Sequence, residues 1–183
     1  MVDAVDGDAE LARAVCDAIA AEVEPERVLR SSLGAVARHL GAAPVALYLQ
    51  SPDGNRLKLE AEFDGGVVGD RAMLPTDRGL AGGVIHSGQL VAAQHPEDDA
   101  RFDLEVDTAS DGMARGLLCV PITLRNQGVG VLRVFLEDGR AASPRTAEIL
   151  AASFSAAVRN ILLYRSLLQT IDEVAEARRQ SRA

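Results

Sequence analysis

The sequence has few cysteines, no long apolar run and a shortage of basic residues. Its two cysteines, Cys16 and Cys119, lie far apart and follow no metal-binding or redox spacing, so we expect both to be reduced and structural. No apolar run approaches the roughly 20 residues that are needed to span a bilayer. Residues 1–6 are acidic and lack the basic and apolar regions of a signal peptide. We therefore expect a cytoplasmic protein without a membrane partner.

The chain carries 27 acidic and 19 basic residues, which gives a formal net charge of −8. Because phosphate backbones bind to basic surfaces, we expect no nucleic-acid partner. No catalytic motif of a kinase, cyclase or phosphatase is present, and we predict no enzymatic activity. With 48% hydrophobic and 25% charged residues, the composition is typical of a soluble globular protein. A chain of 183 residues is long enough for one domain with a real core and an extension.

A β-hairpin is predicted in the second half of the chain. The apolar runs 116–122 and 129–137 are joined by the polar tetrad Arg125-Asn126-Gln127-Gly128. Alternation along the second run places its side chains on two faces: Val129, Val131, Arg133 and Phe135 on one, and Gly130, Leu132, Val134 and Leu136 on the other. Because both faces are mostly apolar, the strand is predicted to lie centrally in its sheet and to be covered on both sides.

Arg133 is the exception on this strand. A charged guanidinium on a covered strand must either be paired or face something anionic or polar. In one hypothesis, Arg133 contacts a ligand that is anionic or bears carbonyl groups, because a guanidinium binds planar oxygens in pairs. In the other, Arg133 pairs with a nearby carboxylate such as Glu60 or Glu62 and only supports the fold.

Helices are expected towards both ends of the chain. Asp8 is expected to cap a first helix that runs from Ala9 to about Val23. A second helix is expected over residues 25–40, because proline suits its first turn and Gly41 suits its end. The last helix is expected over residues 144–179, with Ser143 as its cap.

Shorter elements are expected between these helices. Strands are predicted at residues 45–50, 57–63, 73–75 and 89–93. A short helix that holds Leu80, Val84 and Ile85 is expected between the last two of them, with Thr76 or Asp77 as its cap. Alternation on the first strand predicts that Val45, Leu47 and Leu49 meet the long helices, whereas Tyr48 and Gln50 face the other way.

The last helix carries a heptad seam. Apolar or small side chains recur at steps of 4-3-4-3-4-3-4: Leu150, Phe154, Ala157, Ile161, Tyr164, Leu168, Ile171 and Ala175. Up to Tyr164 the seam is compatible with packing on the sheet. Beyond it, a lone helix would leave apolar side chains exposed, so we expect a parallel coiled-coil homodimer, with a helix folded back on its own domain as the alternative.

Three segments resemble a known family. The segments Phe102-Asp103-Leu104-Glu105-Val106-Asp107, 113–122 and Gly128-Val129-Gly130-Val131-Leu132 are similar to the central signature of GAF domains. Upstream, residues 79–91 are similar to the short helix and following turn of that family. The resemblance covers roughly Pro25 to Tyr164. It implies a regulatory module of a signal-transduction protein that binds a small molecule or dimerises, and it leaves the ligand and any cofactor undefined.

The resemblance also implies an architecture. We expect an α+β fold with a central antiparallel sheet of about five to six strands. Long N- and C-terminal helices would cover one face, and short helices and loops would form a pocket on the other. Residues 1–24 would be a dimerising helix, 25–164 the GAF-like domain and 165–183 a coiled-coil signalling helix. Because residues 173–179 still favour a helix, we expect it to continue into an output domain such as a histidine kinase or a cyclase.

Strand alternation and the resemblance together place a candidate ligand site between the sheet and residues 79–115. Its predicted residues are Tyr48, Gln50, Val84, Ile85, His86, Phe102, Met113, Arg115, Cys119, Arg133 and Phe135. Such a site would be apolar with a few polar groups, as small-molecule pockets usually are.

Several better-defined functions of the family fit the sequence less well. Haem ligation through His86 or His95 is left open, but neither residue is singled out as an axial ligand. Cys119 lies within a strand and outside the usual context of bilin attachment. Leu136 and Glu137 stand where cyclic-nucleotide-binding members often have an Asn-Lys pair. These departures weaken the haem, photoreceptor and cyclic-nucleotide interpretations.

Two alternatives remain. Free methionine sulfoxide reductases are also GAF-like, but their chemistry requires a thiolate and a resolving cysteine close together, and Cys16 lies far from Cys119 in the chain. The other alternative is a ligand-free interaction module whose pocket is filled by its own side chains. Small apolar residues such as Ala46, Ala114 and Val131 are compatible with an open pocket and with a filled one.

Overall fold

The computed structural model of the chain describes residues 2–64, 69–109, 115–137 and 142–180. Its centre is an antiparallel six-stranded sheet with the strand order β3-β2-β1-β6-β5-β4. The strands are β1 (Ala42–Gln50), β2 (Arg56–Phe63), β3 (Met73–Pro75), β4 (Val91–Ala93), β5 (Gly116–Leu124) and β6 (Gln127–Leu136). The predicted fold class is confirmed, and β6 lies near the middle of the sheet as expected.

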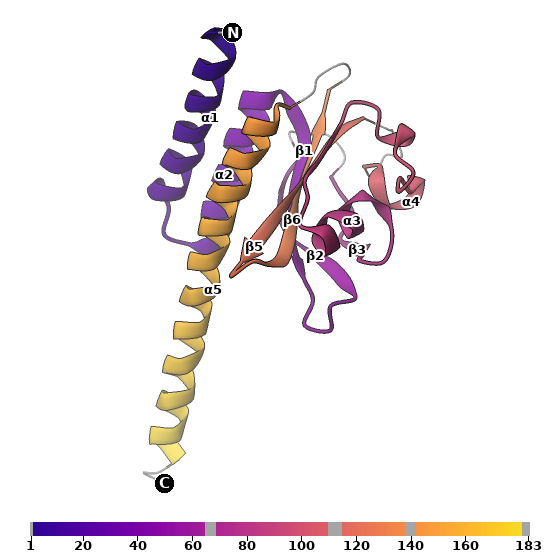
Figure 1. Ribbon diagram of the computed structural model, residues 1–183. Helices are drawn as coiled ribbons and strands as arrows, with labels where there is room; N and C mark the ends of the chain where they lie inside the picture. Colours follow the sequence, from indigo (N-terminus) through magenta and orange to yellow (C-terminus); the bar gives the residue numbers. More distant parts are fainter. Residues whose placement is uncertain (1, 65–68, 110–114, 138–141, 181–183) are drawn as a thin grey trace.

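The helices are divided between the two faces of the sheet (Figure 1). On one face lie α1 (Val2–Ala21), α2 (Pro25–Leu40) and α5 (Pro144–Gln180). On the other lie the short helices α3 (Gly79–Ser87) and α4 (Leu104–Asp107), and a 3₁₀ turn (Pro96–Asp98) precedes α4. The arrangement separates two hydrophobic cores, one on each side of the sheet.

The first core lies between the sheet and the long helices. Val45 and Leu47 of β1 are buried there, and Leu49 packs against it, as strand alternation predicted. From the helices come Leu11, Leu33 and Phe154, each of them fully buried. Leu11 belongs to α1, so this helix is packed into the domain rather than projecting from it.

The ends of the helices follow their local sequence in most places. Gly41 ends α2 in the left-handed conformation, with a φ of 60°, and its N–H donates to the carbonyl of Ala37. The hydroxyl of Ser143 accepts from the N–H of Thr146 at 3.0 Å and so caps α5. The start of α1 was predicted wrongly, because α1 begins at Val2 and Asp8 lies within it. The Asp8 carboxylate instead accepts a 2.6 Å hydrogen bond from the hydroxyl of Thr146.

Helix α5 extends well beyond the sheet (Figure 1). By length and composition alone, it contains an 18-residue window apolar enough to cross a membrane, and 39% of that window is buried inside the structure. Its buried residues all lie in its first half: Thr146, Ala147, Leu150, Phe154, Ala157, Val158 and Ile161. Packing in the first core therefore accounts for part of the apolar composition of this helix.

The β5–β6 hairpin turns more tightly than predicted. Leu124 pairs with Gln127, so the loop consists of Arg125 and Asn126 alone, with φ values of 49° and 64°. Positive φ at both residues is the requirement of a type I′ turn. The next pair is Thr123 with Gly128, and the one after it is Ile122 with Gly130, which leaves Val129 as the extra residue of a β-bulge. Val129 packs against the first core, so the prediction that it shares a face with Val131 was wrong.

Candidate buried polar site around Arg133

The second core lies between the sheet and α3 and α4, where the candidate ligand site was predicted. Val131, Arg133 and Phe135 of β6 all face it. Strand alternation predicted that these three side chains share a face, but not which side of the sheet that face is on. The other residues of this core are apolar except for Tyr48 and Cys119: Ala46, Tyr48, Leu57, Leu74, Leu80, Ala81, Val84, Ile85, Val91, Val106, Ala109, Leu117 and Cys119. Side chains of the chain itself therefore fill much of this region.

Arg133 is fully buried at the centre of this second core. Its Nη1 donates to Oδ1 of Asp70 at 3.2 Å and lies 3.1 Å from Oδ2 of the same carboxylate. Its Nη2 donates to the carbonyl of Val106 at 3.0 Å. The guanidinium also lies over two rings, 4.8 Å from the centroid of Phe135 and 6.0 Å from that of Tyr48. A buried charge is thus compensated by one carboxylate, one carbonyl and two aromatic faces.

Asp70 lies between β2 and β3 and has a buried side chain. Its N–H donates to the Glu62 carboxylate at 2.9 Å, and its Oδ1 accepts from the N–H of Arg71 at 2.8 Å. Burial raises the pKa of Asp70, and the positive charge of Arg133 opposes that shift. Arg133 thus pairs with a carboxylate, as one of the two hypotheses expected, but not with the examples named for it. Glu60 pairs with Arg165 of α5, and Glu62 accepts from the backbone N–H of Asp70.

Tyr48 ties the backbone around Asp70 to the sheet. Its hydroxyl donates to the carbonyl of Arg71 at 2.5 Å. Burial is the largest cause of a raised pKa for Tyr48, and the nearby Asp70 charge adds to it. The tyrosine therefore stays neutral at physiological pH and acts as a hydrogen-bond donor.

Three buried polar atoms around Arg133 have no hydrogen-bond partner within the described part of the chain. They are Oδ2 of Asp70, Nε of Arg71 and Nε of Arg133. Arg71 also reaches α4, because its Nη2 donates to the hydroxyl of Thr108 at 3.5 Å. The two guanidiniums thus contact residues 106 and 108, which are two positions apart. Unsatisfied groups of this kind indicate either an enclosed water or a place for a polar ligand.

Asp107 organises the other end of the second core. Its carboxylate accepts from the N–H of Leu80 at 2.9 and 3.0 Å, and from that of Asp103 at 2.9 Å. It therefore provides the N-terminal acceptor of α3, so the prediction of Thr76 or Asp77 as the cap was wrong. Burial raises the pKa of Asp107, and these backbone donors oppose the shift.

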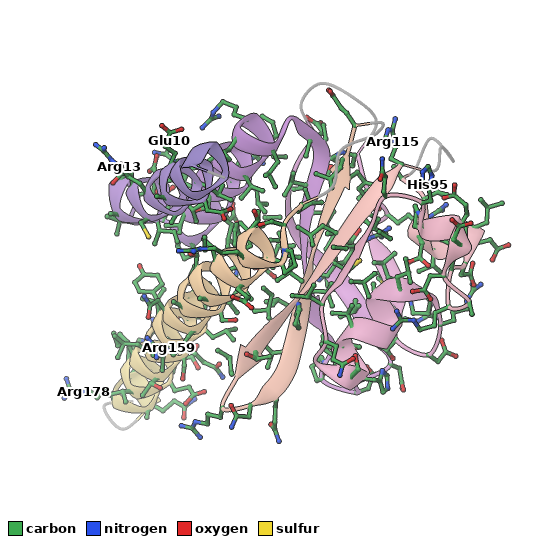
Figure 2. All side chains as sticks on the ribbon, turned by 45° about the horizontal axis from the view of Figure 1, so that its top comes forward. Glu10, Arg13, His95, Arg115, Arg159 and Arg178 are labelled. Carbon is green, nitrogen blue, oxygen red and sulfur yellow. The ribbon has the colours of Figure 1, made fainter. Side chains whose placement is uncertain are left out.

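Not every predicted site residue lies in the second core. Tyr48, Val84, Ile85, Cys119, Arg133 and Phe135 do, and Phe102 packs against it half-buried. Gln50 instead donates to the carbonyl of Gly54 at 3.0 Å, in the β1–β2 turn. Arg115 and His95 project at the same end of the sheet (Figure 2). Met113 lies outside the described residues.

A separate open cleft of about 440 Å³ runs along α3. His86 and Phe102 line it, together with Arg78 and Arg101. Both arginines are already paired, Arg78 with Asp103 at 2.6 Å and Arg101 with Asp99 at 2.7 Å. His86 uses its Nδ1 locally, 3.0 Å from the carbonyl of Gly82. The two arginines and the histidine that line this open cleft therefore already have partners within the chain.

Neither cysteine chemistry nor a metal centre stands out. Burial raises the pKa of Cys119 to about 12, so its thiol is protonated at physiological pH. Cys16 is exposed on α1, which lies on the opposite side of the sheet. Within the described residues, no group of three or more His, Cys, Asp or Glu side chains is arranged to hold a metal ion.

Sequence patterns found the positive half of this site but not its partner. Arg133 was singled out because it interrupts an apolar strand, whereas Asp70 belongs to a loop without periodicity. The only signal for Asp70 was indirect: a buried arginine requires a carboxylate, and the sequence offers many. Asp107 was part of the family-like motif 102–107, but its contact with Leu80 depends on how α4 meets α3.

Solved structures with this fold include a GAF domain, a segment of a chemotaxis protein and a reductase. The GAF domain of an Acinetobacter phosphoenolpyruvate-protein phosphotransferase aligns with a TM-score of 0.70 and 19% identity, over 87% of this chain and 97% of that one. Residues 122 to 287 of a methyl-accepting chemotaxis protein align with a TM-score of 0.65 and 18% identity, over 82% and 98%. A free methionine-R-sulfoxide reductase from Neisseria meningitidis, solved in complex with its substrate, aligns with a TM-score of 0.67 and 18% identity. The alignment covers 84% of this chain and 91% of that one.

At these identities the solved structures establish the fold alone, and the family follows from the sequence. The model of the family described as GAF domain matches residues 22–159, which is most of the chain. The match includes β1 to β6, both short helices and the site around Arg133. The chain therefore belongs to the GAF domain family.

Proposed function

We propose that this GAF domain is a sensory and regulatory input module that works as a cytoplasmic homodimer joined through α5. The observation that carries the proposal is the exposure of the second half of the heptad seam. Tyr164, Leu168 and Ile171 are 44%, 44% and 53% exposed, although they continue the line of Phe154 and Ile161, which are buried. A second copy of α5 would cover them in the pattern of a coiled coil.

The surface next to α1 supports the same arrangement. An apolar groove of about 270 Å³ lies where the end of α1, the start of α2 and the middle of α5 meet. Ile19, Val23, Ile161 and Tyr164 are among its residues, and Val23 is 86% exposed. The groove continues the exposed seam towards the domain, so the proposed interface includes the N-terminal helix as well.

Helix α5 provides a physical link between the domain and the proposed interface. In its first half, Ser155 accepts a 3.0 Å hydrogen bond from the N–H of Thr123 at the end of β5. Its second half protrudes beyond the sheet (Figure 1). A shift of the sheet would therefore move a helix whose far end lies outside the domain. We propose that this helix passes the signal to an output domain such as a histidine kinase or a cyclase, without a nucleic-acid or membrane partner.

A small-molecule ligand remains part of the proposal, at the site around Arg133. A reductase acting on free methionine sulfoxide is the weaker alternative. The high pKa of about 12 for Cys119 and the position of Cys16 across the sheet both oppose it. An assay with free methionine sulfoxide and a thiol reductant tests that alternative directly, and turnover would overturn the proposal that the domain is not an enzyme.

The dimer is tested by placing charge in the exposed seam. Light scattering of the wild-type chain at micromolar concentration should give twice the mass of one chain. Leu168→Glu combined with Ile171→Glu should give monomers, because two pairs of like charges would face each other in the seam. The matched control is Ser166→Glu with Gln169→Glu, which adds the same charge to outward positions of α5 and should leave the dimer intact. A monomeric wild-type chain would overturn the proposal.

A further inference from the structure

We propose that Asp70 occupies the position of a ligand: the site around Arg133 binds a small monocarboxylate, which replaces the Asp70 side chain on the guanidinium. This inference rests on the proposed sensory function and names the class of molecule that the domain would sense. It places the ligand among the residues that surround the Arg133–Asp70 pair, away from the open cleft along α3.

The first argument is that Asp70 uses Arg133 incompletely. A guanidinium has five N–H donors and binds a carboxylate best through two parallel hydrogen bonds. Here Asp70 meets only one nitrogen of the guanidinium, because Nη1 donates to Oδ1 and also lies 3.1 Å from Oδ2. Within the described residues, Nε of Arg133 is buried and lacks a hydrogen-bond partner. A free carboxylate, unconstrained by a backbone, has the freedom to adopt the two-bond geometry.

The second argument concerns where each charge is anchored. Arg133 lies on β6, near the centre of the sheet, and its other nitrogen is fixed by the carbonyl of Val106. Asp70 comes from the connection between β2 and β3, the strands at one edge of the sheet. Its N–H donates to the Glu62 carboxylate, and the carbonyl of the next residue, Arg71, accepts from the Tyr48 hydroxyl. Replacement of Asp70 would leave the sheet and Arg133 in place.

The third argument is the chemistry of the surroundings. The rings of Phe135 and Tyr48 flank the guanidinium, and the second core around them consists mainly of apolar side chains. These groups suit a carboxylate with a short apolar body. The carbonyl of Val106 already contacts Arg133, and the Asp107 carboxylate lies near enough to interact with it electrostatically. The carbonyl oxygen carries a partial negative charge and an ionised Asp107 a full one, so a dianion such as phosphate would be disfavoured relative to a monoanion.

Such an exchange would couple binding to the rest of the domain. Release of Asp70 frees the segment that holds Arg71, whose carbonyl accepts from Tyr48 of β1 and whose side chain reaches Thr108 after α4. Because Asp70 occupies the site, only the molecules in which Arg133 is free can bind the ligand. The apparent affinity is therefore the intrinsic affinity multiplied by the fraction of such molecules. Removing the Asp70 charge should therefore increase the affinity for the ligand, even though it lowers the stability of the ligand-free protein.

The test uses acetate and propionate as probes, titrated into the whole chain at constant ionic strength against chloride. Binding is measured from the backbone amide NMR shifts of residues 70–71 and 106–108. The variants are Asp70→Asn, which keeps the shape of the side chain and removes its charge, and Arg133→Met, which removes the guanidinium. Glu60→Gln is the matched control, because it removes one carboxylate that pairs with Arg165 rather than with Arg133.

We expect saturable propionate binding to the wild-type chain, and an affinity at least about tenfold higher for Asp70→Asn. Glu60→Gln should match the wild type, and Arg133→Met should not bind. The inference is overturned if neither the wild type nor Asp70→Asn binds, if Asp70→Asn binds no tighter, or if Glu60→Gln changes affinity equally. Should Asp70→Asn fail to fold in chloride, recovery of its folded circular dichroism spectrum in propionate supports the inference, and no recovery overturns it.

The oligomeric state of the same samples separates this inference from the proposed function. Carboxylate binding by a chain that proves monomeric would retain the ligand class and overturn the dimeric input module. A stable dimer that binds neither probe would do the reverse.

Discussion

The guanidinium of Arg133 and the carboxylate of Asp70 form an ion pair at 3.1 Å in which both side chains are completely buried. The two residues are 63 positions apart, one on the central strand β6 and the other between β2 and the edge strand β3. The pair fixes the β2–β3 connection against the middle of the sheet.

Removal of either partner of this pair should strongly destabilise the apo domain. We expect Arg133→Met or Asp70→Asn to lower the free energy of unfolding by about 3–5 kcal/mol, because each leaves a buried charge uncompensated. The double variant should lose less than the sum of the two, since it buries neither charge. Urea denaturation of the four proteins, followed by circular dichroism, gives the coupling energy. Additive losses would show that the two side chains do not act as a pair.

The raised pKa of Asp107 leads us to expect that the stability of the domain depends on pH in a particular direction. Burial raises its pKa in the folded state above the value of about 3.9 in unfolded chains. The contribution of its titration is therefore fully present below about pH 4 and is lost as the pH rises through the folded pKa. Asp107→Asn lacks this titration, so the loss of stability that it causes should be smaller at pH 7 than at pH 4. Unfolding free energies measured at both pH values check the sign, and the opposite trend would contradict the raised pKa.

Alanine substitutions at two glycines with positive φ should distinguish the cost of backbone strain from the cost of steric overlap. Gly88 ends α3 with a φ of 67°, and an added Cβ would meet nothing within 4 Å. Gly88→Ala should therefore cost about 1–2 kcal/mol from the left-handed conformation alone. Gly79 begins α3 with a φ of 78°, and a Cβ there would lie 2.7 Å from Cγ1 of Val106. Gly79→Ala should cost clearly more, as measured by chemical denaturation, and an equal cost would argue against close packing of α3 on α4.

The two cysteines should differ sharply in reactivity. Cys16 is exposed, whereas Cys119 is fully buried and has a pKa raised to about 12. A thiol reagent such as 5,5′-dithiobis(2-nitrobenzoic acid) at pH 8 should modify Cys16 quickly and Cys119 only after denaturation. Cys16→Ser provides the control, since its native form should show almost no reaction. Rapid modification of that variant would mean that the second core opens readily.

Local sequence determined much of the fold. Alternation along β1 placed Leu47 on the face of the long helices and Tyr48 on the other, as observed, because successive side chains of a strand point to opposite faces. Alternation along β6 placed Arg133 and Phe135 on one common face, also as observed. Gly41 and Ser143 marked helix ends because αL geometry and side-chain capping depend on one or two residues. The heptad spacing of α5 likewise follows from residues on one helix, and its buried half ends near Ile161.

The residues that contact Arg133 and the N-terminus of α3 depend on the tertiary structure. Asp70 meets Arg133, and Asp107 caps α3, only because loops and short helices return to the sheet at particular points. The bulge at Val129 has the same origin, since register depends on both strands of the hairpin. Sequence alone could establish that a buried arginine needs a carboxylate, because desolvation of a charge is costly wherever it occurs. Which carboxylate pairs with the arginine depends on how the chain brings together two residues that are 63 positions apart, and no local pattern encodes that contact.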